Sequence, residues 1–283
     1  MQFGVFASEI KADSPAELFQ KIKDYGFSCI QFDYQSVCKE TLTQKIVSEL
    51  NSQIAAEITK YNIEIAAINS NLNISHTNLK QFELTASSCK DLSCPLITLS
   101  TALEPNNNTQ ETWKDLCRIT EQCLKIADTY NINIGIEIDT THIINTPQQA
   151  KKFLDELKSH RLKIILDVAN LFQNGTATYT DMKIIIGNAF ELIGRDIALV
   201  HVKDVKSGNG LEFVKAGNGI IDYHILFEEL IKVKYTGDYI IHTFEKEKNV
   251  LPAADFFRQV SVPHQQFLHP QHIPLPKKYF IIR

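Results

Sequence analysis

Three short runs decide the fold: IGIEID at residues 134–139, IILD at residues 164–167 and ALVHVKD at residues 198–204. Each run is rich in β-branched and other apolar residues, and helix-like sequence separates one run from the next. Runs of this kind are typical of parallel strands, because helices cover both faces of such strands and remove the polar alternation of a half-exposed strand. The sequence therefore predicts strands that alternate with helices.

A polar side chain stands near the carboxyl end of each of these predicted strands. The three side chains are Glu137, Asp167 and His201. In a (β/α)8 barrel the active site lies at the carboxyl ends of the strands, so we expect these residues to converge. Carboxylate oxygens and imidazole nitrogens bind divalent metal ions. Taken singly, each carboxylate is compatible with a helix N-cap or a loop, whereas the three together favour a metal site.

The composition is that of a soluble enzyme with a sizeable core: 283 residues, 44% hydrophobic and 22% charged. A single (β/α)8 barrel of about 250 residues fits this length. The net charge of -4 offers no basic surface by composition, so we expect no nucleic-acid partner. The N-terminus lacks a signal-peptide pattern and no run of 18 apolar residues occurs, so we expect a cytoplasmic protein without a membrane partner.

The cysteines show no pattern of a metal or redox site. They form no CxxC pair and no zinc-finger spacing, and the two closest pairs are five and six positions apart, which does not place two sulfurs on one helix face. We interpret them as reduced structural thiols. The six residues are Cys29, Cys38, Cys89, Cys94, Cys117 and Cys123.

Strand-like and helix-like segments alternate along the chain with short connections. Ser14-Pro15 and Thr146-Pro147 each give a helix an N-cap followed by proline at the first helical position. Glycine and asparagine at 207–210 and 217–219 predict an extended loop. A long helix is expected at 39–61 and another at 222–233, and the eight strands are expected at 2–7, 28–33, 63–68, 95–100, 134–137, 164–167, 198–203 and 238–244.

We predict an α/β fold with one domain, a (β/α)8 TIM barrel over residues 1–260. Residues 261–283 contain four prolines and end in an apolar run. We expect them to form a C-terminal tail that packs on the barrel or on a neighbouring subunit of a homo-oligomer. The histidines of this segment are interpreted as solvated rather than as a site.

Four stretches together resemble the xylose isomerase-like TIM-barrel superfamily, which includes sugar phosphate isomerases and epimerases, inosose dehydratases and the endonuclease IV group (AP endonuclease family 2). The resemblance covers about residues 1–260. Its stretches are NIGIE at 133–137 with INTP at 144–147, LDVAN at 166–170, HVKD at 201–204 with GNGIID at 217–222, and YTGDYII at 235–241.

The resemblance implies that Glu137, Asp167 and His201 are metal ligands. The fourth ligand of the family is a glutamate on strand eight, and this chain has His242 at that position. A second departure is Asn170, where members commonly have histidine. The loop NISH at 73–76 resembles the family's substrate-side histidine loop, which makes His76 a candidate substrate contact.

The resemblance and the residues together predict a divalent-metal-dependent isomerase or epimerase of a small sugar, sugar phosphate or polyol. Such an enzyme removes a proton next to a carbonyl while the metal stabilises the enediolate. One ion is expected, and the imidazole of His242 favours Mn, Zn or Co over Mg. The predicted catalytic residues are Glu137 and His242, the metal ligands Glu137, Asp167, His201 and His242, and the substrate contacts His76, Asn170 and Lys203.

Several alternatives stay open at this point. Lys203 has the same strand parity as His201 and either faces the substrate or forms an ion pair with Asp204 or Glu137. His242 is either a ligand or a packed core histidine in a catalytically weakened sugar-binding relative. An endonuclease IV-like DNA-repair hydrolase is less favoured, because the loop LEFVK at 211–215 supplies none of the histidines that its additional metals require.

Overall fold

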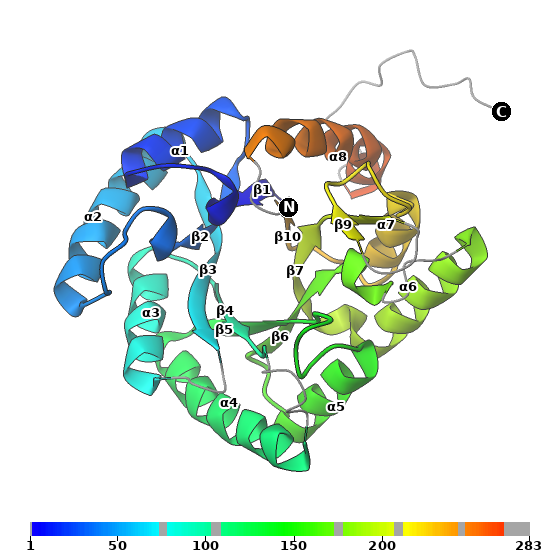
Figure 1. Ribbon diagram of the computed structural model, residues 1–283, viewed down its shortest axis with the longest axis horizontal. Helices are drawn as coiled ribbons and strands as arrows, with labels where there is room; N and C mark the ends of the chain where they lie inside the picture. Colours follow the sequence, from blue (N-terminus) through cyan, green and yellow to red (C-terminus); the bar gives the residue numbers. More distant parts are fainter. Residues whose placement is uncertain are drawn as a thin grey trace.

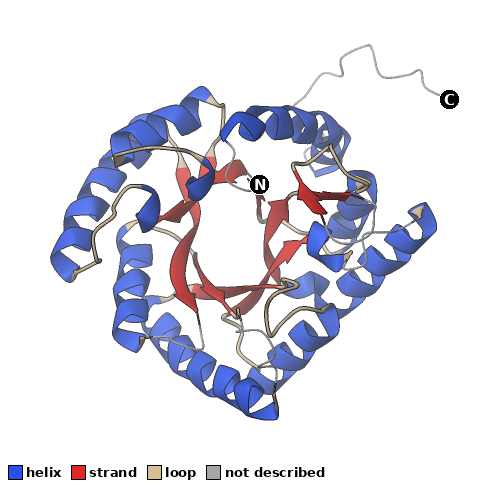
Figure 2. Ribbon diagram, in the orientation of Figure 1, coloured by secondary structure: helices blue, strands red, loops and turns tan. Residues whose placement is uncertain are grey.

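Eight parallel strands close into a barrel in the order β1-β10-β7-β6-β5-β4-β3-β2, and helices surround it (Figures 1 and 2). The computed structural model describes residues 2–73, 78–102, 109–172, 178–206, 212–242 and 247–268. Among these residues no helix is both long enough and apolar enough to cross a membrane. The predicted (β/α)8 TIM barrel is confirmed.

Each barrel strand pairs with the next barrel strand along the chain, and the first strand, β1, pairs with the last, β10, to close the barrel. The barrel strands are β1 (Phe3–Phe6), β2 (Cys29–Asp33), β3 (Glu64–Asn73), β4 (Leu96–Ser100), β5 (Asn133–Glu137), β6 (Leu162–Asp167), β7 (Ile197–Val202) and β10 (Asp238–Ile241). The helices are α1 (Pro15–Asp24), α2 (Gln44–Tyr61), α3 (Leu79–Asp91), α4 (Gln110–Tyr130), α5 (Pro147–Leu157), α6 (Tyr179–Ile193), α7 (Tyr223–Lys232) and α8 (Glu247–Leu268).

The segment after β7 contains two short strands that the sequence did not predict, whereas residues 217–219 lie in a turn as expected and residues 207–211 lie outside the described residues. These strands form an antiparallel hairpin of β8 (Asp204–Lys206) and β9 (Glu212–Val214). The Asp204 carboxylate is buried and accepts backbone hydrogen bonds from Val205, Gly217, Gly219 and Ile221 at 2.9–3.1 Å. One buried carboxylate thus ties the following turn back to the hairpin, an interaction that turn propensity alone does not reveal.

Two predicted boundaries also differ from the structure. Helix α2 begins at Gln44 rather than at residue 39, because the Thr43 side chain accepts a hydrogen bond from the Ile46 backbone and caps the helix there. Helix α8 continues to Leu268, so it crosses residue 261, where the sequence placed the start of the tail. Residues 269–283 lie outside the described residues, and the packing of the tail stays a prediction.

The barrel interior is layered, because every second side chain of each strand points inward. A middle layer is apolar and consists of Cys29, Ala66, Ala67, Leu96, Ile165, Leu199 and Ile240. The next inward positions toward the carboxyl ends of the strands are mostly polar. They are Gln31, Asn69, Thr98, Glu137, Asp167, His201 and His242, so a polar layer rests on an apolar floor.

Gly4 on β1 is paired with Cys29 on β2 and leaves no room for a side chain, and this gives a test of the barrel packing. An added Cβ at Gly4 would lie 2.3 Å from the Cys29 carbonyl oxygen. Gly4→Ala should therefore lower the free energy of unfolding by about 1–3 kcal/mol, measured by urea denaturation. Gly187→Ala in α6 is the control: nothing lies within 4 Å, and it should raise stability by about 0.5–1 kcal/mol. Equal effects at both positions would contradict this packing.

Candidate metal and substrate site

Three side chains of the polar layer converge at one side of the barrel mouth. Asp167 ends β6 and is paired in register with His201 on β7, and His242 directly follows β10. One potential ligand atom from each residue lies within 4.8 Å of those of the other two. The structure thus brings together three of the four residues that the family resemblance implied as metal ligands.

The spacing of these donors suits a shared ion. Donor atoms held at about 2.0–2.2 Å from one tetrahedral ion lie about 3.4 Å from each other. Separations of no more than 4.8 Å therefore require only small side-chain movements to reach that geometry. Asp167 and His201 are buried and His242 is half-buried, so the donor set is one carboxylate and two imidazoles at the edge of solvent. The residues present fit a divalent transition metal.

Glu137, the fourth predicted ligand, stands beside this group of three rather than within it. It ends β5, and its Oε1 lies 3.3 Å from His201 Nδ1. Burial raises the pKa of Glu137, but the nearby charges of His201 and Lys203 outweigh it and hold that pKa well below its usual range. Glu137 is therefore a carboxylate at neutral pH.

His201 contacts an oxygen acceptor at each of its ring nitrogens. Nε2 lies 2.7 Å from Gln31 Oε1, which reaches across the barrel from β2, and Nδ1 faces Glu137. Neither the amide oxygen nor the carboxylate can donate a hydrogen bond. If His201 donates its Nε2 proton to Gln31, the lone pair of Nδ1 faces the carboxylate of Glu137. A positive charge is then needed between Nδ1 and Glu137, and either a second ring proton or a cation shared by the two residues would supply it. Gln31 thus orients His201 as an outer partner orients a metal-bound histidine.

Lys203 is buried and forms an ion pair with Asp167, with 2.9 Å between Nζ and Oδ2. The sequence left open a substrate contact or an ion pair with Asp204 or Glu137, and the ion pair that the structure shows is with Asp167 instead. The register between β6 and β7 explains this ion pair. Asp167 lies beside His201, and Lys203, two residues after His201, is the next inward-facing position of the chain as it leaves β7. The Lys203 ammonium also lies 4.0 Å from the centre of the Phe213 ring on β9, so the hairpin covers the pair.

The two partners of this pair remain charged at neutral pH. Burial raises the pKa of Asp167 to about 6, and the charge of Lys203 opposes that rise. Burial lowers the pKa of Lys203, but Asp167 and Glu137 outweigh it and the net direction is upward. The ammonium therefore acts as a fixed positive charge next to Asp167.

His242 contacts a carboxylate that the sequence did not single out. Its Nε2 lies 3.5 Å from Oε1 of Glu9, a buried residue of the short helix η1 (Ala7–Glu9) that follows β1. Burial lowers the pKa of His242 to about 3, so the ring is neutral, which is the form that binds metals. Glu9 stands a few residues after a strand end, as Glu137 and Asp167 stand at theirs, and that signal could have identified it.

Of the predicted substrate contacts Asn170 and His76, only Asn170 lies within the described residues. Asn170 is fully buried, and its amide nitrogen donates to Glu137 Oε1 at 3.3 Å and to the Ile138 carbonyl at 2.8 Å. The Asn170 amide thus holds the Glu137 carboxylate in place through a hydrogen bond. A contact between Asn170 and substrate stays a prediction. His76 lies outside the described residues.

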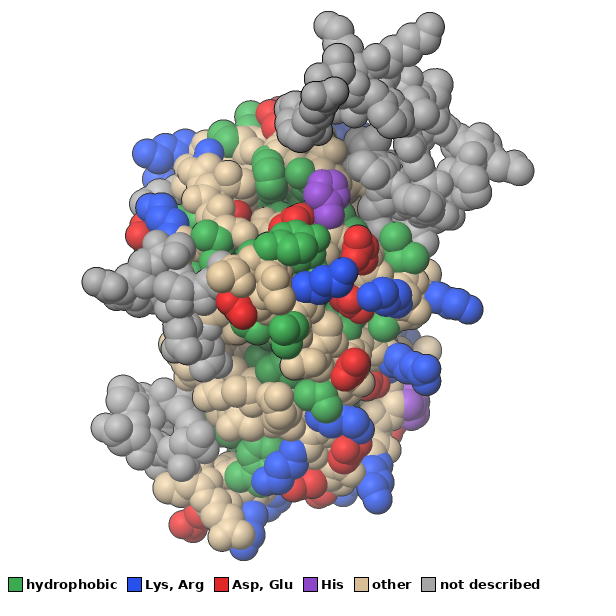
Figure 3. Space-filling model, turned by 90° about the vertical axis from the view of Figure 1, so that its right-hand side faces the viewer, with side chains coloured by type: hydrophobic (Ala, Val, Ile, Leu, Met, Phe, Trp, Pro, Cys, Tyr) green, Lys and Arg blue, Asp and Glu red, His purple; other side chains and the backbone are tan. Residues whose placement is uncertain are grey.

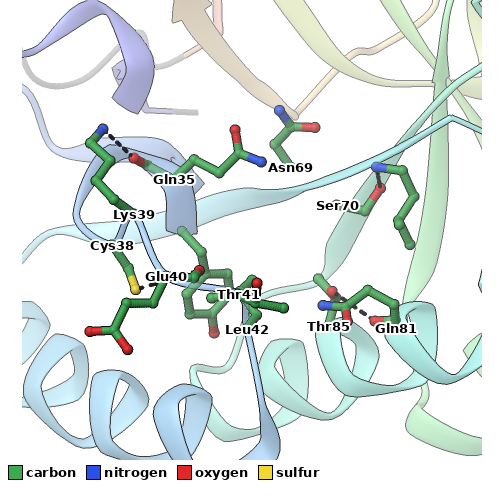
Figure 4. Close-up of a pocket in the computed structure, with 12 residues that line it drawn as sticks. Gln35, Cys38, Lys39, Glu40, Thr41, Leu42, Asn69, Ser70, Gln81 and Thr85 are labelled. Carbon is green, nitrogen blue, oxygen red and sulfur yellow. Dashed lines mark hydrogen bonds between the residues drawn. The ribbon is translucent and has the colours of Figure 1, made fainter.

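A pocket of about 460 Å³ lies beside the barrel mouth, between the segment that follows β2, the end of β3 and the start of α3. Figure 4 shows Gln35 extending toward Asn69, which belongs to the polar layer. Asn69 donates to Asp33 and accepts from Thr98, so hydrogen bonds connect the pocket to the mouth. Neutral amides and hydroxyls dominate this edge, as suits the hydroxyl groups of a polyol.

The fold and the converging donors define a (β/α)8 barrel with a metal-type site at the carboxyl ends of its strands. A sequence model of the xylose isomerase-like TIM barrel family matches residues 19–260, and the chain belongs to that family. The resemblance drawn from the sequence is thereby confirmed.

The chain is similar to known proteins at low sequence identity. The chain is 25% identical over 143 residues to L-ribulose-5-phosphate 3-epimerase UlaE of Escherichia coli, which covers 50% of this chain and 46% of that protein. The chain thus spans about half the length of the curated relatives it matches. A D-tagatose 3-epimerase-like protein superimposes with a TM-score of 0.72 at 18% identity, over 95% of this chain and 100% of the other.

A second solved structure, of the IOLI protein with a bound zinc atom, has a TM-score of 0.72 at 15% identity and covers 94% of this chain and 99% of that one. A xylose isomerase domain protein from Planctomyces limnophilus has a TM-score of 0.73 at 15% identity, over 93% and 98% of the two chains. At these identities the likeness shows the fold alone.

The buried pair of Lys203 and Asp167 can be tested in the metal-free protein. Lys203→Met should lower the free energy of unfolding by about 3–5 kcal/mol, because it leaves a buried carboxylate without its cation. The double variant Lys203→Met/Asp167→Asn should recover part of that loss, measured by denaturant unfolding. Lys206→Met is the control: its ion pair with Glu212 is exposed, and its loss should cost no more than about 1 kcal/mol. Strictly additive effects of the two substitutions would refute the coupling.

Proposed function

We propose that this protein is a divalent-metal-dependent isomerase or epimerase of a small sugar, sugar phosphate or polyol. Asp167, His201 and His242 would hold the ion, and Glu137 would stand beside it. The observation that carries the proposal is the arrangement around His201, an imidazole between two oxygen acceptors and within 4.8 Å of two further donors. A cation at that point satisfies all of these groups at once. The proposal is also supported by the family to which the chain belongs and by its similarity to an epimerase.

The residues around the ion divide into roles that follow from their contacts. A bound divalent ion polarises a carbonyl and stabilises the charge that develops on its oxygen during proton removal. Glu137 is ionised and partly accessible at the mouth, so it would take the proton from the carbon next to the carbonyl. Lys203 would keep Asp167 ionised as a ligand, and Gln31 would hold the His201 ring in orientation.

His242 in place of the family's glutamate changes what the site can do. A neutral imidazole held by Glu9 would serve as a ligand, so among the described residues Glu137 is the carboxylate best placed to move a proton. One base that removes and returns a proton on the same face suits isomerisation between neighbouring carbons. Epimerisation needs a donor on the opposite face, and His242 with Glu9 would have to supply it. Two imidazole donors also favour Zn, Mn or Co over Mg.

Metal binding gives the first test of the proposal. The wild-type protein should bind one Zn or Co ion per chain by calorimetry. Asp167→Asn, His201→Ala and His242→Ala should each abolish stoichiometric binding, because each removes a direct ligand. Glu137→Gln should weaken binding by about 10–100-fold, as for an outer partner. His224→Ala, on the exposed face of α7, is the control and should bind as the wild type does. Unchanged stoichiometry in the His242 variant would remove His242 from the site.

Proton exchange gives the second test and separates an enzyme from a weakened sugar-binding relative. The metal-loaded protein in deuterated water should incorporate deuterium next to the carbonyl of a ketose such as D-tagatose, L-ribulose or L-ribulose 5-phosphate, followed by NMR. Glu137→Gln should reduce the exchange rate by at least about 100-fold, the scale of general-base catalysis. Sugar and metal binding without any exchange across such a panel would support the non-catalytic alternative instead.

A further inference from the structure

A second cavity lies at the opposite end of the barrel from the candidate metal site. Its volume is about 290 Å³, and it lies where β6, β7 and β10 begin. The start of β7 at Ile197 lines it, whereas His201 further along the same strand belongs to the metal site. Two turns complete it: the short helix η5 (Gly194–Asp196) after α6, and the turn at residues 233–237 between α7 and β10.

Three cations and no carboxylate line this cavity among the described residues. The cations are Lys163, Arg195 and Lys234, from three separate segments of the chain. None of the three takes part in an ion pair with a described acidic residue. Cations close by are paired, as Arg161 is with Asp128 at 2.8 Å and Lys232 with Glu229 at 2.6 Å. The cavity is thus lined by three cations that have no ion pair with a described acidic residue.

The negative ends of two helix dipoles offset only part of the positive charge of these three side chains. Helices α6 and α7 end at Ile193 and Lys232, close to the cavity, and the carboxyl end of a helix carries about half a negative charge. Two such ends offset roughly one of the three positive charges of the lining residues. Figure 3 looks onto the side that carries α6 and α7, and Lys and Arg side chains lie there among Asp and Glu side chains.

We propose that this cavity binds a phosphate group, either as inorganic phosphate or as part of a small phosphorylated metabolite. Arg195 presents a planar guanidinium that matches two phosphate oxygens, and Lys163 and Lys234 supply point charges from two other sides. The Thr236 hydroxyl is a further donor at the rim. Ile197 and Ala198 supply part of the apolar lining. The site is separate from the proposed catalytic centre and does not depend on it.

The test uses inorganic phosphate and pyrophosphate as probes with the metal-free protein, so that no metal ion can take up phosphate. Calorimetry at constant ionic strength should show saturable binding with one site per chain. Arg195→Gln/Lys234→Gln should weaken it by at least about tenfold, since two charge-assisted hydrogen bonds to the phosphate are lost. Lys232→Gln removes a nearby paired cation as the control and should change affinity by less than about twofold.

Backbone amide NMR shifts locate the bound anion independently of the variants. Phosphate should shift the amide signals of residues 194–198 and 234–237 and leave those of the barrel mouth unchanged. Shifts confined to Asp167, His201 and their neighbours would place the anion at the other end of the barrel and overturn the proposal. So would linear, non-saturating titration of the wild type, or an equal loss of affinity in Lys232→Gln.

Discussion

The structure depends on the closure of eight parallel strands, which forces every second side chain into a shared interior. An apolar layer fills the middle of that interior, so polar side chains are tolerated only at its open end, where water and a ligand can reach them. The register between β6 and β7 places Asp167 beside His201, and the position after β10 adds His242. The chemistry of the site thus follows from the packing of the barrel.

Buried charges at this end are stable only because each meets an opposite charge or a donor. Lys203 neutralises Asp167, Asn170 donates to Glu137, and Glu9 faces His242. The arrangement contains more carboxylates than cations among these groups, and the imbalance is greatest where His201 lies between Gln31 and Glu137. A divalent ion at that point would complete the charge balance, which connects the electrostatics of the metal-free protein with its proposed function.

Much of the fold and part of the site could be predicted from the sequence. Strand rhythm and apolar runs are local signals, and they predicted the barrel and the strand-end positions of Asp167 and His201. Gln31 and the true partner of Lys203 could not be predicted, because their roles arise from contacts between residues that lie far apart in the chain. The β8–β9 hairpin was missed for a similar reason, since its stability depends on the four backbone donors gathered by Asp204.

The central claim is that His242 has taken the place of a carboxylate as a metal ligand, beside Asp167 and His201. X-ray absorption spectroscopy of the zinc-loaded protein tests this most directly, because imidazole rings give a multiple-scattering pattern that reports how many histidines bind the metal. The account predicts two imidazoles per zinc ion, with Zn–N distances of about 2.0–2.1 Å. A single imidazole in a shell of oxygen ligands would show that His242 lies outside the coordination sphere, and would contradict the account.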